Sequence, residues 1–200
     1  MIRLAALGSI AALSLAACGA PPSEPADAPA APAAPPGPVE PAAPAAEALT
    51  ALGFGPLRIG MTRAEVEAAL GPDANPEAVG GPDPASCDMF RPERAPEGML
   101  VMVENGVLTS VWLSRNTTVE TDRAVNIGDT AAEVKSLYGD AAEVTPHKYV
   151  EAPAEYITVW STADRQSPAA RGLKYEIGRD GRVQTIAGGG PSIQYVEGCL

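Results

Sequence analysis

The sequence predicts an α+β domain, made of two tandem repeats that each pack a short helix region on an antiparallel sheet of three to four strands. Three observations predict this: a duplicated helix-start motif, apolar alternation on either side of two tight turns, and an N-terminal region unlike the rest. The 200 residues carry a formal charge of −11. Nucleic-acid binding needs a clustered basic surface, so this charge argues against a nucleic-acid partner.

Residues 1–17 are predicted to be a lipoprotein signal peptide. A short cationic start with Arg3 precedes an uncharged apolar run from position 4 to position 17, which is too short to span a bilayer. The run ends in Leu-Ala-Ala-Cys at 15–18, which resembles the bacterial lipobox. The resemblance implies cleavage before Cys18 and acylation of its sulfur and amino group with palmitate-type chains. An ordinary signal peptide with a chance cysteine is the alternative.

Residues 18–48 are predicted to be the acylated cysteine and a Pro/Ala-rich disordered tether. Ten of the chain's 21 prolines lie here, and large apolar side chains that could form a core are missing. Pro-rich segments favour the polyproline II conformation at about 3.1 Å per residue, so the tether could span up to about 90 Å. A docking site for a partner is the alternative role.

Two cysteines remain, Cys87 and Cys199. An exported protein meets an oxidising compartment, where a remaining pair is expected to form a disulfide. Two free thiols or a catalytic cysteine are the alternatives, although no His/Asn pattern supports catalysis.

Repeat 1 (49–118) and repeat 2 (119–200) are defined by segments 57–71 and 125–139, which match at a constant offset of 68 positions. Both contain the capping box S/T-x-x-E, followed by apolar residues at helical spacing and a closing glycine. Each segment therefore predicts a short helix, and the cap explains both glutamates without an acid/base role. The capping pairs are Thr62 with Glu65 and Thr130 with Glu133.

Strand-like sequence follows each helix. The turns Asn105-Gly106 and Asp180-Gly181 are typical of hairpin corners, and apolar residues alternate on either side of them. The expected hairpin strands are 98–103 with 107–114 and 172–177 with 182–187; further strands are expected at 87–91, 147–150, 155–161 and 192–196.

The motif I-G-M-T-x-x-E-V-x-x-x-L-G at 59–71 is similar to the opening of the BamE/SmpA-type outer-membrane lipoproteins and to the repeats of the secreted β-lactamase inhibitory protein. The resemblance implies helices followed by antiparallel sheet, in tandem copies. It covers about fifteen residues per copy and carries over no binding residue. Prolines 72, 76, 82 and 84 crowd the region where those families place a second helix.

The inventory of candidate chemistry is short. The single histidine, His147, has no metal-ligand spacing around it, and no nucleophile elbow is present, so no catalytic residue, metal or cofactor is predicted. Aromatic residues on predicted strands are candidates for anchoring a partner if exposed and core residues if buried. They are Trp112, Tyr149, Tyr156 and Trp160.

The expected function is non-enzymatic: a lipoprotein held through its lipid anchor on the periplasmic face of the outer membrane, binding a protein partner or serving envelope assembly. Gly19 after the cysteine favours the outer membrane, with inner-membrane retention as the alternative. The expected contact surface is a sheet face without helices. The competing hypotheses are an enzyme that uses carboxylates on envelope glycans or peptides, for which a pair of buried acids would be required, and a small-ligand carrier with a pocket between the repeats.

Overall fold

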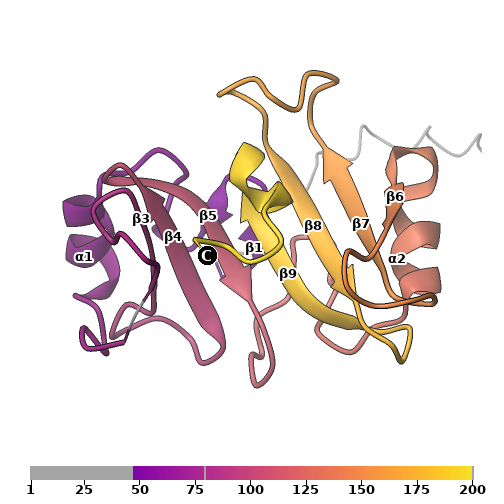
Figure 1. Ribbon diagram of the computed structural model, residues 1–200, viewed down its shortest axis with the longest axis horizontal. Helices are drawn as coiled ribbons and strands as arrows, with labels where there is room; N and C mark the ends of the chain where they lie inside the picture. Colours follow the sequence, from indigo (N-terminus) through magenta and orange to yellow (C-terminus); the bar gives the residue numbers. More distant parts are fainter. Residues whose placement is uncertain (1–46, 79, 200) are drawn as a thin grey trace, which may run out of the picture. The chain divides into compact units, whose positions relative to one another are not determined.

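The computed structural model describes residues 47–78 and 80–199, in which one antiparallel sheet of seven strands forms the centre (Figure 1). The signal peptide, Cys18 and nearly all of the tether lie outside the described residues. The strand order is β3-β4-β5-β9-β8-β7-β6. The strands are β3 (Cys87–Phe90), β4 (Met99–Glu104), β5 (Val107–Leu113), β6 (Glu143–Pro146), β7 (Glu155–Trp160), β8 (Gly172–Ile177) and β9 (Val183–Gly189).

The α+β class is confirmed, but the tandem pair of small sheets is wrong. Strand β5 of the first half pairs antiparallel with β9 of the second, from Ser110 opposite Gly189 to Leu113 opposite Ile186. An unpaired edge strand exposes a row of backbone donors and acceptors. Joining the halves through β5 and β9 satisfies two such edges at once, so the repeats share one sheet.

Two eight-residue helices, α1 (Arg63–Leu70) and α2 (Ala131–Tyr138), lie on one face of this sheet. Both begin with the predicted capping box, in which the threonine hydroxyl accepts from the backbone of the glutamate and the carboxylate accepts from the threonine backbone. These hydrogen bonds lower the pKa of Glu65 and of Glu133. The two caps therefore account for both glutamates as structural residues.

The residues before each helix bind the hairpin of the same half in the same way. Gly60 donates from its backbone to Leu108 at 2.8 Å, and Gly128 donates to Val183 at 2.9 Å. The repeat seen in the sequence is thus a repeated helix-to-hairpin contact within a single sheet.

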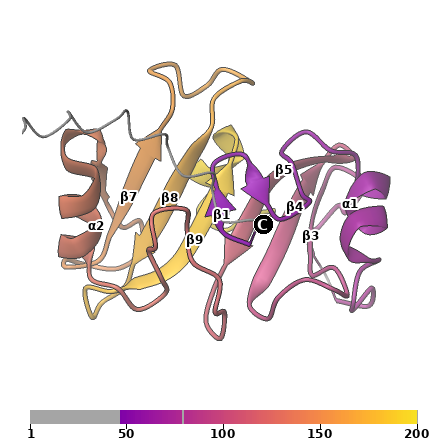
Figure 2. The same ribbon diagram turned by 180° about the vertical axis from the view of Figure 1, so that it is seen from behind.

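The helix side of the sheet holds the larger core, in which Val66 and Val134, one from each helix, are fully buried. A two-stranded ribbon, β1 (Leu49–Thr50) and β2 (Gly53–Phe54), lies between the two helices on this side (Figure 2). Gly188 on β9 has to be a glycine here, since a Cβ would lie 2.5 Å from the carbonyl oxygen of Thr50. Gly189 meets the same limit on the opposite face against the carbonyl oxygen of Thr109.

Residues 190–199, called here the C-terminal strap, cover the central strands on the face opposite the helices. The predicted strand at 192–196 is wrong, because this segment forms the 3-10 helix η2 (Pro191–Gln194) and its Ile193 is fully buried. The strap ends at Cys199, and the predicted Cys87–Cys199 disulfide is confirmed, with the Cα atoms 5.4 Å apart. This bond fixes the end of the chain to β3.

Removing this disulfide should weaken the domain substantially. The two cysteines are 112 residues apart, and closing a loop of that length stabilises a fold by about 4–5 kcal/mol in the chain-entropy description. We expect the double variant Cys87→Ser/Cys199→Ser to lose stability of that order in urea unfolding. Reduction of the natural protein should reproduce the loss, and an unchanged midpoint in both cases would contradict this account.

Candidate functional site

The C-terminal strap decides which of the four candidate aromatics are available at the surface. Trp112 on β5 is buried beneath it, packed with Met102 and Ile193, and its indole Nε1 donates to Ser110 Oγ at 2.7 Å. The face opposite the helices is therefore not open at its centre. Trp112 is a core residue and offers a partner no surface.

Tyr156 on β7 is also buried, in a cluster with two other side chains. The ring of His147 stacks on its ring with the centroids 4.7 Å apart, and the ammonium of Lys174 lies 4.3 Å from the centroid. Its hydroxyl makes no hydrogen bond of good geometry. Burial raises the pKa of Tyr156, and the nearby Lys148 backbone opposes this in part. Trp160, further along β7, is half-buried. It packs against the smaller core, which lies beneath the strap and includes Trp112 and Ile193.

Tyr149 is the one candidate aromatic with most of its surface exposed, at 59%. It lies in the loop between β6 and β7, where its hydroxyl donates to Glu197 of the strap and Lys148 Nζ lies 5.0 Å from its ring centroid. The structure thus brings Tyr149, Tyr156 and Trp160 to the second half of the sheet and leaves Trp112 beneath the strap.

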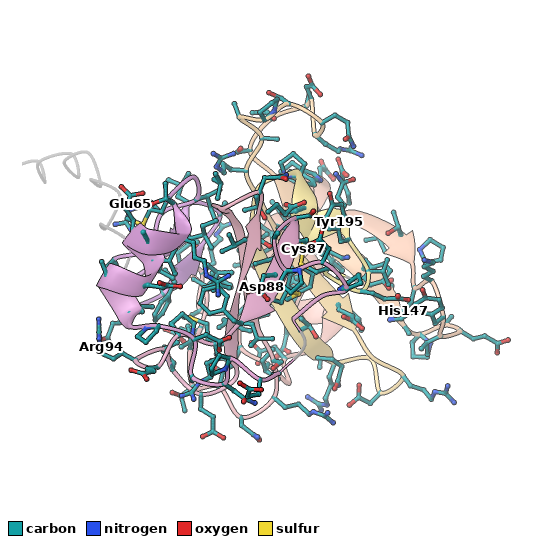
Figure 3. All side chains as sticks on the ribbon, turned by 60° about the vertical axis from the view of Figure 1, so that its left-hand side comes forward. Glu65, Cys87, Asp88, Arg94, His147 and Tyr195 are labelled. Atoms are coloured by element: carbon teal, nitrogen blue, oxygen red, sulfur yellow. A yellow bond between two sulfur atoms is a disulfide. The ribbon has the colours of Figure 1, made fainter. Side chains whose placement is uncertain are left out.

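His147 holds the conformation of this loop. Its Nδ1 accepts from the backbone of Tyr149 at 3.1 Å and of Val150 at 3.2 Å, so Nε2 is the nitrogen that donates, to Glu176 at 3.1 Å. The hydrogen bonds of both ring nitrogens are thus made to residues of the same domain, which is a structural role for His147. Figure 3 shows His147 on the side of the second half, away from Cys87 and Tyr195.

The two edges of the sheet differ. At the β3 edge, the preceding loop occupies outward-facing backbone groups, with Met89 donating to Gly80 and Ala74 donating to Arg91. At the other edge, the backbone of β6 has hydrogen bonds only with β7 among the residues the structure describes. Strand β6 therefore keeps an outward row of unpaired backbone donors and acceptors.

A groove of about 820 Å³ lies beside this edge, between the start of α2 and the loop that follows β6. Its lining is mainly apolar, and the side chain of Val144 on β6 is 45% exposed there. Lys135 on the α2 side is paired with Glu155 at 2.6 Å, so this ion pair offers little net charge. The groove and the edge together form the candidate site, called here the β6 surface.

Neither metal binding nor paired-acid catalysis finds support in the described part of the chain. It holds no group of three or more His, Cys, Asp or Glu side chains that could bind a metal. Its one buried carboxylate, Asp88, is held by Arg63 at 2.6 Å, and Arg63 also lies over the ring of Phe90. A pair of buried acids facing one cleft, as the glycosidase-like hypothesis requires, is therefore not found among these residues.

Comparisons of the chain with protein-family models, curated proteins and solved structures return no match. The similarity of 59–71 to the BamE/SmpA type and to the inhibitory-protein repeats stays a prediction. Between positions 47 and 199, leaving out 79, no helix has the length and apolar character needed to cross a membrane.

Two features of the site were missed by sequence reasoning. The sequence places a strand at 147–150, whereas the strand is β6 and 147–150 is the loop held by His147. Lys174 is 6% exposed although it is a lysine. The alternation Leu-Lys-Tyr-Glu-Ile at 173–177 signals that Lys174 and Glu176 share the face opposite the core, but it does not indicate the strap that covers this face.

Replacing His147 should release the loop locally. We expect His147→Ala to speed amide hydrogen exchange at Tyr149 and Val150 and to lower the free energy of unfolding by about 0.5–1.5 kcal/mol, because both amides exchange the ring nitrogen for water. His147→Asn, which keeps an acceptor oxygen, is the matched variant and should retain part of the protection. Unchanged exchange at both amides in the alanine variant would show that the ring does not hold this loop.

Proposed function

We propose that the chain is a membrane-anchored envelope lipoprotein whose folded domain is a non-enzymatic module that binds a partner protein through the β6 surface. The observation that carries the proposal is the unpaired edge of β6 next to a mainly apolar groove. An exposed strand edge binds an extended segment of another chain by strand addition, in which backbone hydrogen bonds supply affinity and neighbouring pockets select side chains. The partner is thus expected to contribute an extended segment with apolar side chains.

The energetics are compatible with reversible binding. A four-residue strand such as β6 can add only a few intermolecular hydrogen bonds, each worth about 0.5–1.5 kcal/mol net. The exposed side chains of Val144 and Tyr149, which both line the groove, would add apolar contact with the new strand. Tyrosine is a frequent binding anchor because its large ring buries much area at small entropic cost.

The N-terminal region supports a membrane setting for this module. The lipobox-like segment ending in Cys18 and the Pro/Ala-rich 18–48 region fit a lipid anchor followed by a spacer. We place the domain on the periplasmic face of the outer membrane, with the inner membrane as the alternative. The Cys87–Cys199 disulfide is compatible with this oxidising side.

The anchor is tested by Cys18→Ser. Without the acylated sulfur, the protein should move from the membrane to the soluble fraction in carbonate-washed membrane preparations. A second variant, Cys199→Ser, leaves the lipobox intact and should stay with the membrane. Retention of the Cys18→Ser protein on membranes would reject the anchor.

The β6 surface is tested by photocrosslinking in intact cells. A photoreactive phenylalanine analogue at Val144 should give one discrete adduct with another protein, whereas the same analogue at Leu52 should not. Leu52 is a matched control, since it is 61% exposed and apolar but lies in the turn between β1 and β2.

The adduct must depend on the surface itself. With the analogue at Tyr149, the added change Val144→Asp should remove the adduct, because a carboxylate would be brought into the groove, while Leu52→Asp should not. Adducts of equal yield from positions 52 and 144, or an adduct indifferent to Val144→Asp, would overturn the proposal. An adduct that contains only a second copy of this chain would replace a foreign partner by self-association.

A further inference from the structure

A second cavity lies on the sheet face opposite the helices, and Thr145 and Pro146 of β6 line both this cavity and the groove of the β6 surface. Its volume is about 250 Å³, and it is lined by residues of strands β6, β7 and β8, by Arg165 from the loop between β7 and β8, and by Gln194 and Val196 of the C-terminal strap. A cavity of this size and polar lining suits a small molecule rather than a peptide. The side chains of Lys174, Arg165 and Trp160 line it.

Lys174 is the unusual residue of this cavity. It projects from β8 on the face opposite the core, is 6% exposed, and has no carboxylate within 4.0 Å among the described residues. Its ammonium donates only to carbonyl oxygens of the strap, at 3.1 Å to Tyr195 and a weaker 3.5 Å to Gln194. Glu176, two residues along the strand, is engaged by His147.

Burying an ammonium without an anion is expensive, and the strap carbonyls together with the face of the Tyr156 ring compensate only part of the cost. The loss of hydration lowers the pKa of Lys174, and the more distant Glu176 opposes this. An anion inside the cavity would supply the missing partner and would be held strongly, because charge-assisted hydrogen bonds strengthen where water is excluded.

Arg165 adds a second cation at the cavity wall. It reaches in from the loop between β7 and β8 and pairs with Glu143 on β6. A guanidinium has five N–H donors, and this is the one hydrogen bond that Arg165 makes within the described residues, so donors remain. With two cations and one carboxylate, the lining has a net charge of +1 in a chain whose total is −11.

We propose that this cavity, the strap pocket, binds a small monocarboxylate whose charged group lies between Lys174 and Arg165. A single net positive charge matches a monoanion better than a dianion. The indole of Trp160 and the hydroxyls of Thr145 and Thr158, which also line the pocket, suit a ligand with a compact apolar or weakly polar remainder. The proposal requires no protein partner, although β6 contributes residues both to this pocket and to the β6 surface.

Benzoate is a suitable probe, and benzamide is its neutral match in shape. Titration calorimetry of the purified full-length protein, with the disulfide intact, should detect benzoate binding, with benzamide bound at least about tenfold more weakly. Inorganic phosphate should also bind more weakly than benzoate. Absence of benzoate binding, equal binding of benzamide, or preference for phosphate would each overturn the proposal.

Three variants assign the site. Lys174→Met keeps the length of the side chain and removes the charge, and it should weaken benzoate binding about tenfold to a hundredfold. Arg165→Gln should also weaken it. Arg179→Gln changes an exposed arginine in the turn between β8 and β9 and should leave affinity unchanged.

Lys174 also holds the strap, so its variant could unfold. Circular dichroism decides whether Lys174→Met is folded; if it is not, the half-exposed Arg165 carries the test alone. Weaker binding by Arg165→Gln with an unchanged melting temperature supports the pocket. Affinity equal to that of the natural protein in either folded variant would overturn the inference, because both cations are required to hold the carboxylate.

Discussion

The pairing of β5 with β9 is the constraint on which the rest of the domain depends. It joins the two repeats at equivalent hairpin strands, because β5 and β9 are each the second strand of the hairpin that binds its own helix start. Once these two edges are paired, both helices lie on one face and the other face is shared across the halves. The C-terminal strap covers that shared face, so its burial of Trp112 is a consequence of the same pairing.

The strap covers a sheet face that the helices leave without cover. A seven-stranded sheet has two broad faces, and the two eight-residue helices and the β1–β2 ribbon cover only one. On the second face, Ile193 and Cys199 supply apolar cover over the first-half strands and the centre. Over β8 the cover is made of backbone carbonyls above Lys174, which is why the smaller core ends in a polar cavity there.

Local features of the fold could be predicted from the sequence, whereas contacts between distant segments could not. The capping boxes, the two hairpins and strand β7 follow from patterns within fifteen residues, and all are present. The disulfide followed from compartment and cysteine count. The β5–β9 pairing has no local signature, since the alternation in either strand is satisfied by any neighbour that buries the same face.

The two errors at the site have different physical causes. Apolar residues at 192–196 alternate as in a strand, but their partner is a sheet face rather than a strand edge, so tertiary packing favoured a 3-10 helix. The strand predicted at 147–150 failed because His147 satisfies two amides of that segment with its own ring. At 192–196 a long-range partner outweighed local preference, whereas at 147–150 a local side-chain contact replaced strand pairing.

The two outer edges show how a sheet built from two similar halves can avoid open-ended assembly. Two equivalent halves joined at their centre would leave two free edges, and two free edges on one molecule permit open-ended assembly. Here the Pro-rich loop at 72–86 closes the β3 edge, through Gly80 and Arg91, while β6 stays open. Strand β6 is short and ends in Pro146, and both features limit extended pairing with a second copy. The asymmetry between two otherwise similar halves therefore leaves a single, short edge, which favours one extended partner segment over an unlimited array.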